Sequence, residues 1–258
     1  MKPLLSAPAE ANVVWVDDVD STNEMLARVQ AAWPDDDERI LADTLLVAGR
    51  QSAGRGRSSH VWESPPGGLY ASWLAYLGTA SLAWLPLAAG VCLLGALEEA
   101  MAPQRFGLKW PNDVMSSGGK LAGLLCQSRS RGDSCWVVVG FGVNVEAAPE
   151  LAAGLAPAAS LRGLGLEGAA AAAIWRIVEF FLAGIRPAIA DPARTRALWA
   201  SRSIHVPGDM LRVRSGGEVV KGAFSGFAED GSLKLTVNGA VRSFSAAELI
   251  VPLPETGG

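Results

Sequence analysis

The stretch Leu69-Tyr70-Ala71-Ser72-Trp73-Leu74, followed by a helical run from Leu85-Pro86 through Glu98-Glu99, decides the fold class. No charged residue occurs from Ser64 to Leu97, and that length could span a bilayer. However, prolines and glycines punctuate the segment, and proline suits the first turn of a helix. A buried strand followed by a buried helix therefore explains it better than a membrane span does.

Strand and helix patterns alternate on both sides of this stretch, up to about Trp199. The mixture indicates an α/β or α+β domain with a largely buried sheet. We expect Lys120–Arg129 and Trp136–Asn144 to pair. The other expected strands are Val13–Val16, Thr44–Ala48, Leu69–Leu77 and Gly107–Trp110, and the expected helices are Glu24–Trp33, Leu85–Met101 and Ala169–Ile185.

After Arg202 the pattern changes to short strands joined by hairpin turns. Asp230-Gly231 and Asn238-Gly239 are strong hairpin signals, because both residues of such a turn need positive φ. The sequence predicts a small antiparallel barrel from Met210–Arg214, Glu218–Ala228, Ser232–Val237, Ala240–Phe244 and Leu249–Leu253. We therefore expect two domains, residues 1–201 and 202–258.

Composition narrows the classes of function. The chain has 258 residues, half of them hydrophobic, and a net charge of −4 without a basic run, which argues against nucleic-acid binding. Cys92, Cys126 and Cys135 form no metal-ligand pattern, and the N-terminus lacks a signal-peptide run. Reduced thiols in a cytoplasmic protein are expected.

The loop Gly54-Arg55-Gly56-Arg57 carries two arginines between glycines. Glycine lets main-chain N–H groups approach phosphate oxygens, and the arginine fork matches phosphate and carboxylate geometry. Trp62 could cover such a site or stack on a base. An ordinary exposed loop with two arginines is the alternative.

Lys109-Trp110-Pro111-Asn112-Asp113 ends an apolar strand and is more specific. One interpretation is ordinary turn chemistry; the other places Lys109 on a phosphate and Asp113 near a cation or leaving group. Lys120 follows Ser116-Ser117-Gly118-Gly119, which predicts a hairpin return that brings a second amine to the same end of the sheet.

Ser21 with Glu24 predicts a capping box that opens a helix, which leaves Thr22 and Asn23 free for a polar ligand. Asn144, after Gly140-Phe141-Gly142-Val143, fits either a plain turn or an amide that binds a flat ligand. His60 and His205 are too isolated for a metal cage or a catalytic triad.

Taken together, these residues resemble the biotin protein ligase family, over nearly the whole chain. The motifs fall in that family's order: Val19-Asp20-Ser21-Thr22-Asn23, Gln51-Ser52-Ala53-Gly54-Arg55-Gly56-Arg57, Lys109-Trp110-Pro111-Asn112-Asp113, Lys120-Leu121-Ala122-Gly123 and Gly140-Phe141-Gly142-Val143-Asn144.

The resemblance implies a mixed sheet packed on helices, similar to class II synthetases, and a small C-terminal SH3-like barrel. It also implies an enzyme that makes biotinyl-5′-adenylate and pyrophosphate from biotin and ATP, with Mg²⁺. The biotin then passes to a lysine of a biotin carboxyl carrier domain. Keeping the adenylate intact requires excluding water, so the glycine-rich loop is expected to close over it.

By the same resemblance, Arg55, Arg57 and Lys120 would neutralise the carboxylate and α-phosphate, and Lys109 would serve the departing pyrophosphate. The residues expected at biotin are Ser21, Thr22, Asn23, Gln51, Arg55, Gly56, Arg57, Lys120 and Gly123. Those expected at ATP are Trp62 over the adenine, Lys109, Asn112, Asp113 (also at Mg²⁺) and Asn144 at the adenine edge.

Three departures from the family pattern matter. A further Gly-Arg pair is replaced by Ser59-His60, and an acidic residue by Gln127, which puts loop closure and that carboxylate's role in question. Only about a dozen residues precede the first strand, too few for a helix-turn-helix domain. We therefore expect no operator binding, no membrane association and, as one option, a homodimer through an exposed edge strand.

Three alternatives stay open at the level of sequence. A lipoate-type ligase would use the same acyl activation, although the Lys109–Asp113 motif and the C-terminal barrel favour biotin. A biotin-binding or sensing protein without catalysis would fit Gln127 and Ser59-His60, although both arginines and both lysines favour catalysis. A structural adaptor would leave the charged loops unexplained.

Overall fold

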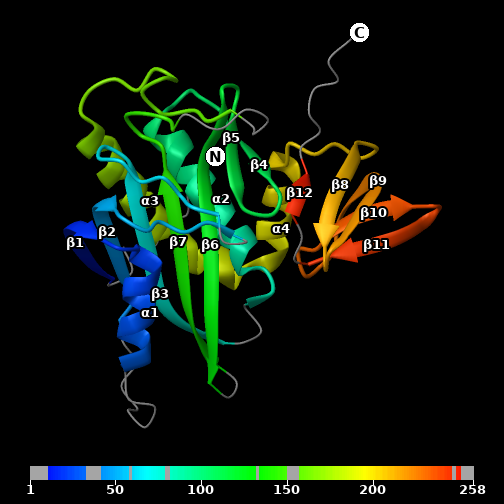
Figure 1. Ribbon diagram of the computed structural model, residues 1–258, viewed down its shortest axis with the longest axis horizontal. Helices are drawn as coiled ribbons and strands as arrows, with labels where there is room; N and C mark the ends of the chain where they lie inside the picture. The colour runs from blue at the N-terminus through cyan, green and yellow to red at the C-terminus, as the bar shows by residue number, and fades with distance from the viewer. Residues whose placement is uncertain are drawn as a thin grey trace.

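The computed structural model describes residues 11–32, 42–57, 60–78, 82–131, 134–149, 157–245 and 248–250. These residues form one seven-stranded sheet with helices on both faces and one five-stranded sheet beside it (Figure 1). In chain order the elements are β1 Asn12–Val19, α1 Thr22–Ala32, β2 Thr44–Gln51, β3 Leu69–Gly78, α2 Leu85–Ala100, β4 Gly107–Lys109, β5 Asp113–Ser116, β6 Gly119–Arg131, β7 Ser134–Val143, α3 Ala170–Ala190, α4 Pro192–Arg202, β8 Met210–Ser215, β9 Glu218–Phe227, β10 Leu233–Val237, β11 Ala240–Phe244 and β12 Glu248–Ile250.

The larger sheet is mixed, as the sequence predicts. Its order is β1-β2-β3-β7-β6-β5-β4, with β1 parallel to β2 and the other neighbours antiparallel. The expected pairing of β6 with β7 is confirmed, with Gly123 opposite Gly142. This register brings the glycines of two separate motifs side by side at one end of the sheet.

Alternation along the strands divides the sheet into two buried faces. Leu45, Val47 and Trp73 belong to the main core, which α2 and α3 cover, whereas Leu46 and Leu74 face α1. In Figure 1, α1 accordingly lies in front of the sheet and α2 behind it. Residues buried on both faces explain the uncharged runs of the sequence.

The uncharged segment is a strand followed by a helix, so the predicted buried strand and buried helix are confirmed. The first part of the segment forms β3 and the second part forms α2, with Pro86 in the first turn of α2. Within the described ranges, none of the helices combines the length and the hydropathy that a bilayer crossing requires.

The sequence did not predict β5 or α4. β5 is four residues long and pairs with both β4 and β6. α4 had a readable signal, because Asp191 precedes Pro192: the Asp191 side chain caps the helix by accepting a hydrogen bond from the Arg194 N–H at 3.0 Å. α4 ends at Arg202, next to the domain boundary that the sequence predicts.

The C-terminal strands form an antiparallel sheet in the order β11-β10-β9-β8-β12. Asn238 and Gly239 both have positive φ, 50° and 80°, as the hairpin signal predicts. The hairpin predicted at Asp230-Gly231 is also present and joins β9 to β10. The expected positive φ is wrong for Asp230, because only Gly231 adopts it, and the Asp230 carboxylate accepts a hydrogen bond from Ser232 N–H at 2.9 Å. β11 and β12 are opposite edges of the described sheet, so the expected closed barrel is not confirmed.

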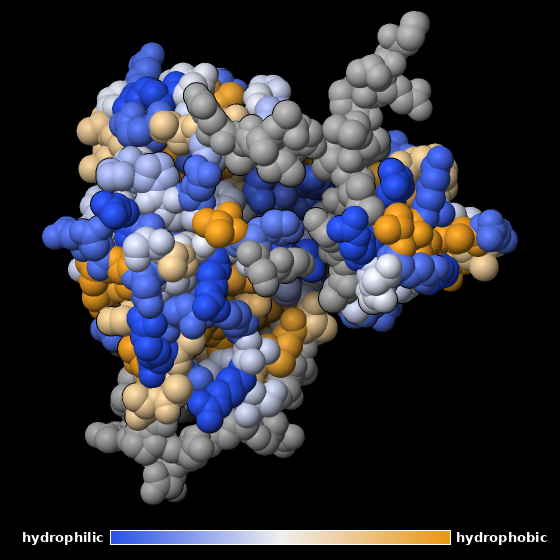
Figure 2. Space-filling model, viewed as in Figure 1, coloured by the Kyte–Doolittle hydropathy of each residue, from blue (hydrophilic) through white to orange (hydrophobic). Residues whose placement is uncertain are grey.

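Two buried contacts join the small sheet to the larger domain. Trp110 is 2% exposed, and its Nε1–H donates to the main-chain oxygen of Gly231 at 3.1 Å. The Trp199 ring of α4 packs edge-on against Phe227, with ring centroids 6.4 Å apart. Figure 2 shows hydrophobic residues at the surface of the small sheet itself, where Met210, Val219 and Val241 are exposed.

Trp199→Ala should lower the free energy of unfolding by about 3–5 kcal/mol, because the ring is fully buried against Gly90 of α2. The matched control is Trp175→Ala on α3, whose ring is 44% exposed against Trp15. It should cost roughly 1.5 kcal/mol or less. Guanidinium denaturation measures both, and equal losses would contradict the central position of Trp199.

Candidate active site

A cavity of about 360 Å³ opens where five segments meet: the start of α1, the arginine loop, the turn between β4 and β5, the start of β6 and the end of β7. Every residue that the sequence predicts for the site lines this single cavity. They are Ser21, Thr22, Asn23, Gln51, Arg55, Gly56, Arg57, Trp62, Lys109, Asn112, Asp113, Lys120, Gly123 and Asn144. The individual roles of these residues stay predictions.

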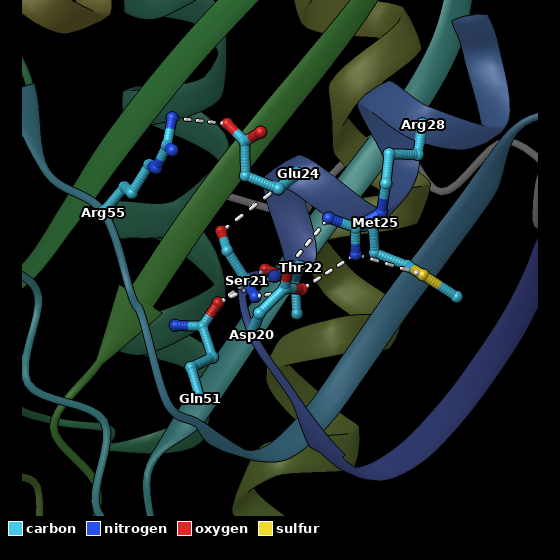
Figure 3. Close-up of polar contacts among 8 residues, drawn as sticks. All are labelled: Asp20, Ser21, Thr22, Glu24, Met25, Arg28, Gln51 and Arg55. Atoms are coloured by element: carbon cyan, nitrogen blue, oxygen red, sulfur yellow. Dashed lines mark hydrogen bonds and ion pairs between the residues drawn. The ribbon is translucent and has the colours of Figure 1, made fainter.

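The start of α1 is capped differently from the predicted capping box. Ser21 Oγ accepts a long hydrogen bond from the Glu24 N–H at 3.5 Å, which is the expected first half. The Glu24 carboxylate does not return to the Ser21 N–H, which donates to Asp20 Oδ1 instead. Glu24 pairs with Arg55 at 2.7 Å (Figure 3). The capping box is therefore only half formed, because the Glu24 carboxylate forms an ion pair with Arg55, which is itself predicted to bind the ligand.

Thr22 and Gln51 are held together on the cavity wall. Gln51 Oε1 accepts from the Thr22 N–H at 2.8 Å and lies 3.1 Å from Thr22 Oγ1, as Figure 3 shows. Gln51 Nε2 donates to Ser64 Oγ, and Ser64 donates to the Trp62 oxygen. These side chains are fixed before any ligand arrives, and all of them are uncharged.

Glycines in β6 and β7 let the side chains of neighbouring residues pack directly against the main chain at the base of the cavity. A Cβ at Gly142 would clash with the Trp62 ring, and one at Gly123 would lie 2.9 Å from it. A Cβ at Gly140 would clash with the Asn23 side chain. The Trp62 ring therefore packs against two strands, where only glycine leaves room. Its Nε1 is buried without a hydrogen-bond partner in the described part of the chain.

Two lysines and one aspartate form the charged end of the cavity. Lys120 Nζ lies 2.7 Å from Asp113 Oδ1 and 5.3 Å from the centroid of the Trp62 ring. Burial lowers the pKa of Lys109, the Asp113 charge opposes that shift, and the Lys120 charge adds to it. The hairpin return that the sequence predicts is confirmed, since β5 and β6 bring Lys120 to Asp113.

Arg55 and Arg57 complete a group of four cationic side chains around one cavity. Arg55 is exposed, and its guanidinium pairs with the Glu24 carboxylate on α1. Arg57 is half-buried in the same loop. The convergence that the sequence predicts is therefore present, although Arg55 and Lys120 each hold a carboxylate partner.

Two asparagines of the predicted ATP end are tied to the main chain. Asn144 Nδ2 donates to the Ala159 oxygen at 3.0 Å and reaches the Lys120 oxygen at 3.4 Å. Asn112 Nδ2 donates to the Leu124 oxygen at 2.6 Å. Their amide nitrogens thus hold β6 and the neighbouring loops in place, which leaves their oxygens for any contact with a ligand.

Some residues that matter to the cavity escaped the sequence reasoning. Ser72 hydrogen-bonds to Thr22 and Asn23, and Ser64 accepts a hydrogen bond from Gln51. A polar residue inside the otherwise apolar strand β3 was the sequence signal that could have identified Ser72. Gln127, which departs from the family pattern, accepts a hydrogen bond from Asn23 Nδ2 at 3.1 Å. Ser59, the other departure, lies outside the described residues.

The donor set does not form a dedicated metal centre. Among the described residues, no group of three or more His, Cys, Asp and Glu side chains could hold an ion. Asp113 offers one carboxylate, and Lys120 already neutralises it. Such a site suits Mg²⁺ only as it arrives on ATP, since Mg²⁺ commonly binds through one or two carboxylates plus substrate phosphates.

Comparisons with known proteins agree with this geometry. Residues 19–144 match the Biotin/lipoate A/B protein ligase family. A biotin–[acetyl-CoA-carboxylase] ligase of Paracoccus denitrificans is 32% identical, over 79% of this chain and 88% of the relative. A ligase of the same name from Mycobacterium tuberculosis is 34% identical, over 80% and 78%.

A solved structure is also similar over nearly its whole length. The biotin protein ligase from Aquifex aeolicus in complex with biotin and ATP is 27% identical with a TM-score of 0.73, and the match covers 92% of this chain and 98% of that one. The fold and site define an acyl-activating ligase. The chain belongs to the biotin/lipoate A/B protein ligase family, as a biotin protein ligase.

His205 gives the cavity's surroundings a pH dependence. Burial lowers its pKa to about 4, the Lys109 charge adds to this, and Asp209 opposes it. The folded state therefore binds no proton there between about pH 6.5 and 4, while the unfolded state does. Stability from this group is present above pH 6.5 and is lost as the pH falls toward 4.

The variant His205→Phe should remove that loss. Relative to it, the unmodified chain should lose on the order of 1–2 kcal/mol of unfolding free energy between pH 7 and pH 4.5. Urea denaturation at several pH values measures the difference. Parallel pH profiles for the two proteins would show that His205 titrates alike in the folded and unfolded chains.

Proposed function

We propose that this cavity binds biotin and ATP together and that its cationic side chains carry the adenylation. The chain is an ATP-dependent biotin protein ligase: it forms biotinyl-5′-AMP from biotin and ATP and then transfers the biotin to a specific lysine of a biotin carboxyl carrier protein. The observation that carries the assignment is the convergence of four cations and an uncharged hydrogen-bonding wall in one cavity.

The cations meet an electrostatic requirement of the first step. The biotin carboxylate attacks the α-phosphorus of ATP, so two anions must come into contact. Their repulsion is large unless positive charge stands at the meeting point, and charges already in place require little reorganisation. Arg55, Arg57 and Lys120 lie at the same cavity and supply that charge.

The ion pair between Lys120 and Asp113 suits this role. Asp113 Oδ1 holds Lys120 Nζ at 2.7 Å, which fixes the amine at the cavity. An anionic substrate would compete with Asp113 for the same amine. Lys109, with its lowered pKa, sits beside this pair and would serve the departing pyrophosphate, with Mg²⁺ brought by ATP near Asp113.

The uncharged wall suits biotin, whose head offers both N–H and carbonyl groups. Ser21, Thr22, Asn23 and Gln51 would contact that head, and Gly56 and Gly123 would let the ligand approach the main chain. The adenine would lie by Trp62, with Asn112 and Asn144 at its edge. Trp62 now covers Gly123 and Gly142, so this role requires its ring to share or leave the base of the cavity.

Further assignments concern the small sheet, the assembly and the location of the protein. We propose that the small sheet is an SH3-like barrel, supported by its consecutive antiparallel order and the register shift between Lys234 and Leu235. A homodimer through β1 is supported by its edge position and by exposed Trp15. Cytoplasmic location and the absence of operator binding also stay proposals.

The assignment is tested by incubating the chain with ATP, Mg²⁺, biotin and a carrier domain. We expect a biotinylated carrier lysine, detected by mass spectrometry, and pyrophosphate release that depends on biotin. Lipoate in place of biotin should give neither product. Binding of biotin without pyrophosphate release would identify a sensing protein instead of a ligase.

Arg57→Ala and Lys120→Ala should each raise the adenylation barrier by about 2–4 kcal/mol, because each removes charge that stabilises the developing anion. This corresponds to a fall in rate of roughly 30- to 1,000-fold, measured by pyrophosphate release. Arg50→Ala and Lys221→Ala, which remove exposed cations elsewhere, serve as matched controls. Unchanged turnover in both cavity variants would move the charge-neutralising role to other residues.

A further inference from the structure

Ser72 stands directly behind the uncharged wall of the cavity. It is fully buried in β3, and its Oγ lies 2.7 Å from Thr22 Oγ1 and 2.6 Å from Asn23 Oδ1. Ser72 does not line the cavity, whereas Thr22 and Asn23 do. Any effect of Ser72 on a ligand must therefore pass through these two residues.

The orientation of Asn23 follows from its other neighbours. Asn23 Nδ2 lies 3.3 Å from the main-chain oxygen of Leu125 and 3.1 Å from Gln127 Oε1. A main-chain carbonyl only accepts hydrogen bonds, so the amide nitrogen of Asn23 must face it. The amide oxygen of Asn23 must then face Ser72.

This orientation fixes the Ser72 proton. A serine hydroxyl has one proton, and Asn23 Oδ1 has none, so the 2.6 Å contact requires Ser72 to donate to Asn23. Ser72 Oγ also lies within donating distance of Thr22 Oγ1, at 2.7 Å, but its one proton is used by Asn23, so at that contact the Thr22 hydroxyl donates and Ser72 Oγ accepts. The other acceptor near that hydroxyl, Gln51 Oε1 at 3.1 Å, also lies inside the protein wall.

Either way the Thr22 proton is used within the protein, so toward a ligand in the cavity that Thr22 lines, Thr22 Oγ1 can only accept a hydrogen bond. We propose that Ser72 is a positioning residue that makes Thr22 a hydrogen-bond acceptor and so selects a ligand with an N–H donor at this point. The inference rests on the proposed function, in which that donor is a ureido N–H of biotin.

The role of Ser72 predicts what its loss would do. In Ser72→Ala, Asn23 Oδ1 loses its donor, and the Thr22 hydroxyl is released from its nearer acceptor. Only the longer contact, to Gln51 Oε1 at 3.1 Å, then holds the Thr22 proton inside the wall, so the hydroxyl turns toward the cavity more readily. Turned that way, it repels a ligand N–H group and donates to a ring oxygen. The variant should therefore distinguish less well than the unmodified chain between a ligand with an N–H group at this point and one with an oxygen.

The experiment uses biotin and its two cyclic carbamate analogues, each with one ureido N–H replaced by oxygen. Calorimetry on the full chain should show at least one analogue binding 10-fold or more weaker than biotin. In Ser72→Ala, biotin should bind about 3- to 30-fold weaker, and the preference over that analogue should fall at least 3-fold. The KM for ATP should stay unchanged.

Two further variants separate positioning from simple stability. Thr195→Val removes another buried hydroxyl, one that donates to the Ala188 oxygen at 2.7 Å far from the cavity, and should leave analogue preference unchanged. In a Thr22→Val background, Ser72→Ala should add no further change in preference, because Ser72 acts through Thr22. Ser72→Cys, with a weaker donor, replaces Ser72→Ala if the alanine variant does not fold.

Undiminished preference in a folded Ser72→Ala or Ser72→Cys chain would overturn the inference. A further loss of preference in the Thr22→Val background would overturn it as well. Failure of the unmodified chain to bind biotin would instead defeat the proposed function. The two failures are therefore distinguishable.

Discussion

The site depends on a steric constraint at one end of the larger sheet: the side chains of Trp62 and Asn23 pack directly against the main chain of glycines. Gly123 of β6 and Gly142 of β7 stand opposite each other, and the Trp62 ring occupies the space that their side chains would take. Gly140 gives the same room to Asn23. The motifs far apart in sequence meet because these strands are paired, and the cavity exists because they carry glycine there.

The charged and uncharged residues of the cavity lie in separate places. The wall formed by Thr22, Asn23 and Gln51 is uncharged and already hydrogen-bonded, whereas the opposite end holds Lys109, Lys120 and Asp113. Buried amines are costly unless compensated, and Asp113 compensates Lys120 until an anion arrives. One cavity thus has an uncharged wall on one side and, at the other end, an ion pair between Lys120 and Asp113 beside the partly buried amine of Lys109.

Much of this could be predicted from the sequence, because the responsible patterns are local. Apolar runs located β2, β3, β6 and β7, and Asn238-Gly239 marked its hairpin correctly. The site residues followed from motif order, and they do share one cavity. β5 was missed because four residues after a Pro-Asn turn give no periodicity of their own, and its pairing comes from the neighbouring strands.

The remaining misses were contacts between distant segments. Glu24 pairs with Arg55, so a local capping pattern yielded to an ion pair across 31 residues. Ser72 meets Asn23 across 49 residues, and no local rule predicts that partner. Barrel closure depends on how the outer strands meet, which hairpin signals do not specify.

The hydrogen bond from Trp110 to Gly231 has a consequence for how the chain melts. Trp110 belongs to the turn that presents Lys109 and Asp113, and Gly231 belongs to the small sheet, 121 residues away. Detaching the small sheet would leave a buried indole N–H without its acceptor. Partial unfolding of the C-terminal region therefore costs free energy at the turn between β4 and β5, next to Lys109 and Asp113.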